Sequence, residues 1–222
     1  MTGRDSNFMG GKYSLFRLAI LLTGLLFITA CSNPASDKPQ AVTNEAAPVA
    51  ATSPAVQGER YLISAENSKI EFIGSKVTGS HHGSFKKFSG AIIFNGQPQT
   101  SSVNVTIETA SIEADDPGLT KHLQTADFFD VAKYPQTTFV STAIKAGGDK
   151  GTHTVTGNLT MHGVTKSLTF PATIAVTPEA ITVDSTFSIN RKDFGINYAG
   201  AADNLIRDDV VLTLKIRGVK AS

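Results

Sequence analysis

The chain has 222 residues, of which 20 are basic and 19 acidic, with one cysteine, no tryptophan and a formal net charge of +1. A single cysteine excludes an intrachain disulfide framework. The near-neutral charge argues against nucleic acid as a partner, because proteins that bind nucleic acid concentrate basic residues to neutralise phosphates.

Residues 1–30 predict an export signal. The uncharged stretch 18–30 follows Arg4, Lys12 and Arg17, which is the order found in a secretory leader. A helix of this length spans about 20 Å, whereas the hydrocarbon of a bilayer is roughly 30 Å thick. We therefore expect a leader that is cleaved rather than a helix that spans the membrane.

Cys31 follows the apolar stretch directly. Residues 28–31, Ile-Thr-Ala-Cys, resemble a bacterial lipobox, so we expect residues 1–30 to be a lipoprotein signal peptide and Cys31 to be acylated. The resemblance implies a periplasmic protein of the bacterial cell envelope that is lipid-anchored to a membrane, and Ser32 favours the outer membrane. The alternative is an ordinary leader with an incidental cysteine, which would leave a free thiol in an oxidising compartment.

Residues 31–58 are rich in alanine, proline, serine and threonine. Their only large apolar side chains are Val42, Val49 and Val56. Such a segment cannot bury enough surface to offset its conformational entropy. We therefore predict a disordered tether between the anchor and the folded domain.

Residues 59–222 fit one domain. Apolar and polar residues alternate along stretches such as 103–108 and 154–161, which is the pattern of half-buried β-strands. The alternation recurs often enough to predict eight or nine strands. One short helix is expected near 117–124, with Asp115 or Asp116 as its N-cap and a proline in its first turn.

An all-β domain of this kind is a sandwich or a barrel, and the pattern alone does not separate the two. Four small residues occupy positions that the alternation turns inward: Gly90, Gly157, Ala172 and Ser185. They would fill a solid core poorly, which favours a hollow barrel. The alternative is that the glycines only bend the strands.

Six separated segments resemble the YceI-like polyisoprenoid-binding family, in the same order along the chain. The resemblance covers nearly all of residues 59–219. The segments are 83–93 (GSFKKFSGAII), 123–134 (LQTADFFDVAKY), 134–139 (YPQTTF), 157–166 (GNLTMHGVTK), 189–196 (INRKDFGI) and 202–212 (ADNLIRDDVVL).

The resemblance implies an extended, lipocalin-like antiparallel β-barrel of about eight strands that binds an isoprenoid or another long-chain lipid in its interior. It brings no cofactor. It implies a carrier or storage protein for isoprenoid-related metabolism or envelope stress rather than an enzyme. The alternatives are an enzyme acting on an isoprenoid or lipid and a structural envelope protein without a ligand, and a homodimer is left open.

Inward-facing apolar residues are the expected lining of the cavity, although an error of one residue in strand register would turn a whole set outward. The predicted lining is Phe72, Phe88, Ile92, Val105, Ile107, Phe139, Leu159, Met161, Phe170, Phe187, Ile189, Leu212 and Leu214.

A polar head group would need hydrogen-bond donors at the mouth of the barrel. The candidates are His81 and His82, which we place in a glycine-serine turn, together with Asn190 and Arg191. A salt bridge between Arg191 and a carboxylate such as Asp193 is the alternative role for the arginine. We predict no metal site, because adjacent strand residues point to opposite faces. We also predict no catalytic residues, because residues 59–222 lack GxSxG, HExxH, phosphate-loop and CxxC motifs.

Overall fold

The computed structural model describes residues 33–47, 57–148, 150–202 and 204–221. The predicted leader and Cys31 lie outside the described residues. No helix within these ranges has the length and apolar character that crossing a membrane requires.

The described residues are mostly β-strands. The helical elements are α1 (Pro117–Leu123) and the 3-10 helices η1 (Thr109–Ser111) and η2 (Arg191–Phe194). The strands are β1 (Val42–Glu45), β2 (Glu59–Ser64), β3 (Lys69–Lys76), β4 (Gly79–Phe85), β5 (Phe88–Asn95), β6 (Gln97–Glu108), β7 (Ile112–Ala114), β8 (Gln136–Ala146), β9 (His153–Met161), β10 (Val164–Val176), β11 (Ala180–Asn190), β12 (Gly200–Ala201), β13 (Asn204–Leu205) and β14 (Asp209–Lys220).

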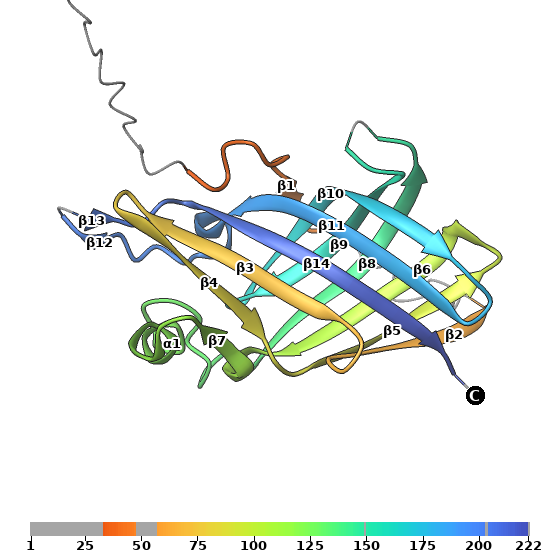
Figure 1. Cartoon of the computed structure of the whole chain (residues 1–222), viewed down its shortest axis with the longest axis horizontal. Coiled ribbons are helices and arrows are strands. Elements are labelled where there is room, and N and C mark those ends of the chain that lie inside the picture. Colours follow the sequence, from red (N-terminus) through yellow and green to blue (C-terminus); the bar gives the residue numbers. More distant parts are fainter. Residues whose placement is uncertain (1–32, 48–56, 149, 203, 222) are drawn as a thin grey trace, which may run out of the picture. The chain divides into compact units, whose positions relative to one another are not determined.

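Eight strands close into an antiparallel barrel in the order β10-β9-β8-β6-β5-β2-β14-β11, with β11 returning to β10 (Figure 1). The predicted all-β barrel is thereby confirmed. Closure pairs edges that would otherwise be free to aggregate. β14 pairs with β2 only at Val219 and Lys220, because its first half, Val211–Lys215, pairs with β3.

One end of the barrel carries the helix. Figure 1 shows α1 and β7 at the same end as the β3–β4 hairpin and the short pair β12–β13, while the C-terminus lies at the opposite end. The predicted helix is confirmed. Asp116 is its N-cap, the Asp116 carboxylate accepts a hydrogen bond of 2.6 Å from the Leu119 N–H, and Pro117 opens the first turn. We call this the α1 end.

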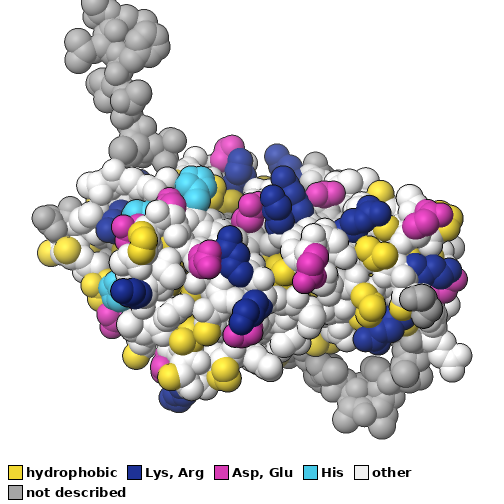
Figure 2. Space-filling model, turned by 60° about the horizontal axis from the view of Figure 1, so that its bottom comes forward, with side chains coloured by type: hydrophobic (Ala, Val, Ile, Leu, Met, Phe, Trp, Pro, Cys, Tyr) yellow, Lys and Arg dark blue, Asp and Glu magenta, His cyan; other side chains and the backbone are white. Residues whose placement is uncertain are grey.

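Apolar side chains line the barrel interior, and charged ones lie on its outside. Figure 2 shows basic and acidic side chains beside one another across one face. Lys86 and Glu113 form an exposed ion pair at 3.5 Å. Exposed ion pairs contribute at most about 1 kcal/mol each. The burial of residues such as Tyr61, Phe187 and Phe194 therefore stabilises the fold more than the surface charges do.

The prediction of a disordered tether is wrong for residues 33–47. β1 pairs with β10, from Val42 opposite Thr169 to Glu45 opposite Lys166. Ala41 is 7% exposed and belongs to the hydrophobic core. Composition gave no sign of this strand, because main-chain hydrogen bonds hold it and main-chain hydrogen bonds need no apolar side chain.

Candidate ligand-binding cavity

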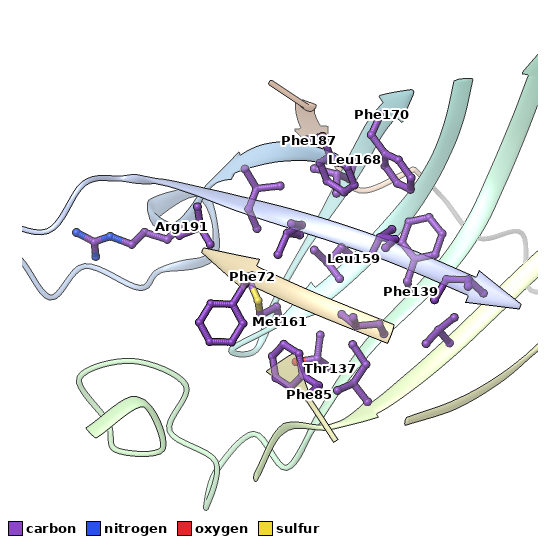
Figure 3. Close-up of a pocket in the computed structure, with 18 of the residues that line it drawn as sticks. Phe72, Phe85, Thr137, Phe139, Leu159, Met161, Leu168, Phe170, Phe187 and Arg191 are labelled. Atoms are coloured by element: carbon purple, nitrogen blue, oxygen red, sulfur yellow. The ribbon is translucent and has the colours of Figure 1, made fainter. Parts of the chain in front are cut away.

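The barrel encloses a cavity of about 220 Å³. A single water molecule needs roughly 10–15 Å³ on this measure, so the cavity has room for part of a lipid tail. Twenty-eight residues line it, and only Thr137 and Arg191 among them have polar side chains. Figure 3 shows labelled side chains from several strands converging on this space.

Alternate side chains along the strands of the barrel form most of the cavity wall. On β9, Val155, Leu159 and Met161 line the cavity, while their neighbours Asn158 and Thr160 lie on the other face, as successive strand residues must. The same alternation holds on β14, where Val210, Leu212, Leu214 and Ile216 line the cavity.

The two ends of the cavity are built differently. At the α1 end the wall includes residues outside the strands: Leu123, Phe128, Phe129, Ile196 and Ile206. At the opposite end lies a second, much smaller cavity of about 20 Å³. Val103, Ile144, Ile174 and Val183 line both cavities and therefore form a partition between them.

Eleven of the thirteen predicted lining residues are in the cavity wall; Phe88 and Ile92 are not. Phe88 is buried in the hydrophobic core beside the wall, opposite Ile107. Ile92 lines the small cavity. The direct contacts of the eleven with a ligand stay a prediction.

Many other lining residues were not predicted. Eight of them continue the inward registers of the predicted ones, so alternation could have found them: Ile70, Val103, Val155, Leu168, Ile174, Val183, Val210 and Ile216. Ile144 does not, because the register of β8 shifts between Ser141 and Ala143. The residues at the α1 end lie in loops and the helix, where no period marks a buried side chain.

The small residues that suggested a hollow barrel do not line the cavity. A Cβ atom at Gly157 would overlap the ring of Phe139, so the aromatic side chain already fills the space beside this glycine. Ser185 donates a hydrogen bond of 2.5 Å to the carbonyl of Pro171. The hollow arises instead from the diameter of an eight-stranded ring.

Arg191 is 4% exposed and is the one charged residue in the wall. Its guanidinium points away from the apolar side chains (Figure 3) and donates to the carbonyls of Ile196, Ile206 and Arg207 at 2.7, 3.5 and 3.1 Å. Its carboxylate partner is Asp208, at 3.3 Å, so the salt bridge expected with Asp193 or another carboxylate forms with another carboxylate. Burial lowers the pKa of Arg191, and Asp208 opposes that shift.

These contacts leave Arg191 a structural role. The guanidinium holds together the loop from Ile196 to Asp208, which closes part of the α1 end. Because backbone carbonyls and Asp208 already accept hydrogen bonds from the guanidinium, it has no free pair of N–H donors for a ligand head group.

The other head-group candidates lie outside the cavity wall. His81 and His82 are in strand β4, not in a turn, which corrects our placement. The Asp115 carboxylate lies 2.8 Å from Nδ1 of His81 and accepts a hydrogen bond of 2.9 Å from the His82 N–H. These two contacts, the backbone one first, lower the pKa of Asp115 below its usual 3.8. Asn190 caps η2 by accepting from the Lys192 N–H.

His122 contacts Phe128, a residue of the cavity wall at the α1 end. Its Nε2 lies 2.8 Å from Asp127, and its ring packs edge-on against Phe128 and Tyr198. The contact between His122 and Tyr198 joins the end of α1 to the loop after η2, so His122 helps to close this end of the barrel. Among the described residues, no three His, Cys, Asp or Glu side chains gather to hold a metal ion.

Known proteins resemble this chain in sequence and in fold. The YceI-like domain matches residues 61–218. A UPF0312 protein of Pseudomonas putida is 41% identical over 146 residues, covering 63% of this chain and 73% of the relative.

Two solved structures align over most of their length. BcnA of Burkholderia cenocepacia is 29% identical, with a TM-score of 0.60 over 70% of this chain and 98% of its own. A polyisoprenoid-binding domain from Saccharophagus degradans shares the fold alone, at 16% identity, with a TM-score of 0.59 over 74% of this chain and 100% of its own. Because the family match spans most of the chain and the barrel has the matching architecture, the protein belongs to the YceI-like family.

Proposed function

We propose that the protein binds the long apolar tail of a polyisoprenoid or a similar amphiphile in the barrel cavity. The observation that carries the proposal is the wall itself, in which twenty-six of twenty-eight residues are apolar. Empty apolar cavities of this kind stay dry and take up apolar guests. The structural relative described as polyisoprenoid-binding supports this ligand class.

Carriage or storage suits the energetics of such a cavity. Burial from water gains about 25 cal/mol per Å² of apolar surface. A tail that leaves a bilayer, however, exchanges one apolar environment for another, and ordering the flexible tail costs free energy. The transfer between membrane and barrel is therefore close to balanced, which allows loading and release.

The proposed location is the periplasmic side of a bacterial membrane, with the protein anchored to the outer membrane through acylated Cys31. This rests on the lipobox-like residues 28–31. Cys31 is only two residues before the described segment that starts at Asn33. An anchor at Cys31 would thus hold the barrel close to the membrane, not on a long tether.

The test is the lipid content of the full-length protein purified from membranes. Native mass spectrometry and lipid extraction are expected to recover an amphiphile with a long apolar tail, chemically unchanged after incubation. Leu159→Trp, which places a larger side chain in the cavity, is expected to reduce loading. Thr160→Trp, on the next residue but the outer face, is the matched control and is expected to load normally.

Empty wild-type protein, or equal loading of the two tryptophan variants, would overturn the proposal. Chemical conversion of the lipid would instead identify an enzyme. The anchor has its own test, because Cys31→Ser is expected to release the protein from the membrane fraction.

A further inference from the structure

The barrel wall has a gap between β10 and β11. The two strands pair only near their turn, with Thr173–Val176 opposite Ile181–Asp184. Pro171 lies where they part, and proline has no N–H to donate to β11. From there to the α1 end, β10 pairs with β9 and β11 pairs with β14. We call this gap the β10–β11 seam.

Residues 39–47, which we call the N-terminal strap, occupy the seam. The Ser188 N–H donates to the Pro39 carbonyl at 2.9 Å, and the Ala41 N–H donates to the Ser188 carbonyl at 2.8 Å. On the other side, β1 pairs with residues 166–169 of β10. The strap is thus a short additional strand, bonded to both sides of the seam.

Side chains fasten the two ends of the strap. The Asn158 amide makes two hydrogen bonds with the backbone of Ala47, at 3.1 and 2.8 Å. Lys166 pairs with Glu45 at 2.6 Å, and Gln40 bonds to Asp209 at 3.3 Å. Asn158 itself is 7% exposed, so the strap covers it.

The cavity lies directly behind the strap. Leu168 and Phe170 on one side of the seam and Phe187 and Ile189 on the other all line the cavity. The strap adds only small side chains to the interior, with Ala41 in the hydrophobic core. Detaching the strap would therefore uncover the apolar side chains of the seam, where the stacked rings of Phe170 and Phe187 would have to part to admit a tail.

The strap makes little apolar contact with the rest of the barrel. Its one large apolar side chain, Val42, points outward and is 57% exposed. Segments held by a few hydrogen bonds and little apolar contact open locally at a lower free energy than the rest of a fold. The strap precedes the matched family domain, which starts at residue 61, and the pairings of β10 with β9 and of β11 with β14 do not run through it.

We propose that the β10–β11 seam is the lateral entrance through which the lipid tail passes, and that the N-terminal strap closes it. The inference rests on the proposed function. It also gives the anchor a role, because Pro39 follows Cys31 by eight residues and a membrane-held Cys31 keeps the entrance beside the bilayer that supplies the lipid.

The experiment measures how fast the full-length protein takes up a dansyl-labelled C20 prenyl ether from phosphatidylethanolamine–phosphatidylglycerol vesicles. Asn158→Ala removes both bonds to Ala47 and is expected to raise the uptake rate by about tenfold, because the opened strap becomes more populated. Asn104→Ala is the matched control. Asn104 makes a similar bond to the Ala91 N–H, at 3.0 Å, on β6 and away from the strap, and its rate is expected to stay unchanged.

A second variant locks the strap. Val42→Cys with Thr169→Cys joins two residues that face each other across β1 and β10. Oxidation is expected to slow uptake by at least about tenfold, and reduction to restore it, with the bound fraction at equilibrium unchanged. Val42→Cys alone controls for disulfides between two copies of the protein.

Uptake at the wild-type rate in both Asn158→Ala and the oxidised double variant would overturn the entrance and leave the proposed function standing. Absence of probe binding in every variant, wild type included, would overturn both. Circular dichroism of each variant establishes that the barrel is folded.

Discussion

The rings of Phe170 and Phe187 stack with their centroids 4.4 Å apart and their planes 12° from parallel. One comes from β10 and the other from β11, so the pair spans the seam that the strap covers. Both rings also line the cavity. The contact therefore joins the two strands where their backbones are not bonded to each other.

Phe187→Ala is expected to lower the free energy of unfolding by about 3–5 kcal/mol, because a 1% exposed ring is lost and its partner is left beside a void. Urea denaturation measures the change. Tyr198→Ala, at a ring that is 37% exposed, is the control and is expected to cost about 1 kcal/mol. Equal losses for the two variants would show that the stack adds nothing.

Ile144→Ala is expected to let the protein bind lipids with longer tails. Ile144 belongs to the partition between the two cavities, and its truncation joins them, so a longer tail fits. Native mass spectrometry of the loaded protein measures the chain length. Ile189→Ala, which trims the wall near the α1 end, is the control: both variants lose about 2–5 kcal/mol of stability, and only Ile144→Ala shifts the distribution.

Arg191→Met is expected to lower the free energy of unfolding by about 3 kcal/mol, because it leaves buried carbonyls and Asp208 without their partner. Lys192→Met is the control. Lys192 pairs with the same Asp208, at 2.9 Å, but is exposed, so its loss costs less than about 1 kcal/mol. Urea denaturation compares them. A larger loss for Lys192→Met would contradict the structural role of Arg191.

Ionisation of Asp115 makes the free energy of unfolding depend on pH in the acidic range. Because its folded-state pKa is lowered, the ionised carboxylate stabilises the fold above its unfolded-state pKa, and this contribution is lost as the pH falls through the folded-state pKa. Asp115→Asn is therefore expected to be less stable than wild type at neutral pH, with the difference shrinking below about pH 4. Urea denaturation at several pH values checks the trend. A difference that stays constant into acid would contradict it.

The all-β class, the α1 helix and most of the cavity wall could be predicted from the sequence. Alternation marks Val105, Leu159 and Phe187 as inward, because a strand sends successive side chains to opposite faces. The Asp116–Pro117 start of the helix follows equally local rules. These features depend on a few neighbouring residues, so the chain carries them without its tertiary contacts.

Closure of the two ends of the barrel, and of the β10–β11 seam, was decided only by the tertiary structure. Ile196 and Ile206 line the cavity from loops that have no period, and the guanidinium of Arg191 finds its partners through contacts that no spacing rule predicts. The strap differs most from the prediction, because residues 39–47 have the composition of a disordered segment and yet form a strand. Its main-chain groups bond to Ser188 and to β10, far along the chain. Backbone donors and acceptors are the same in every sequence, so only the folded barrel, with an unpaired edge on each side of the seam, could select this segment to fill it.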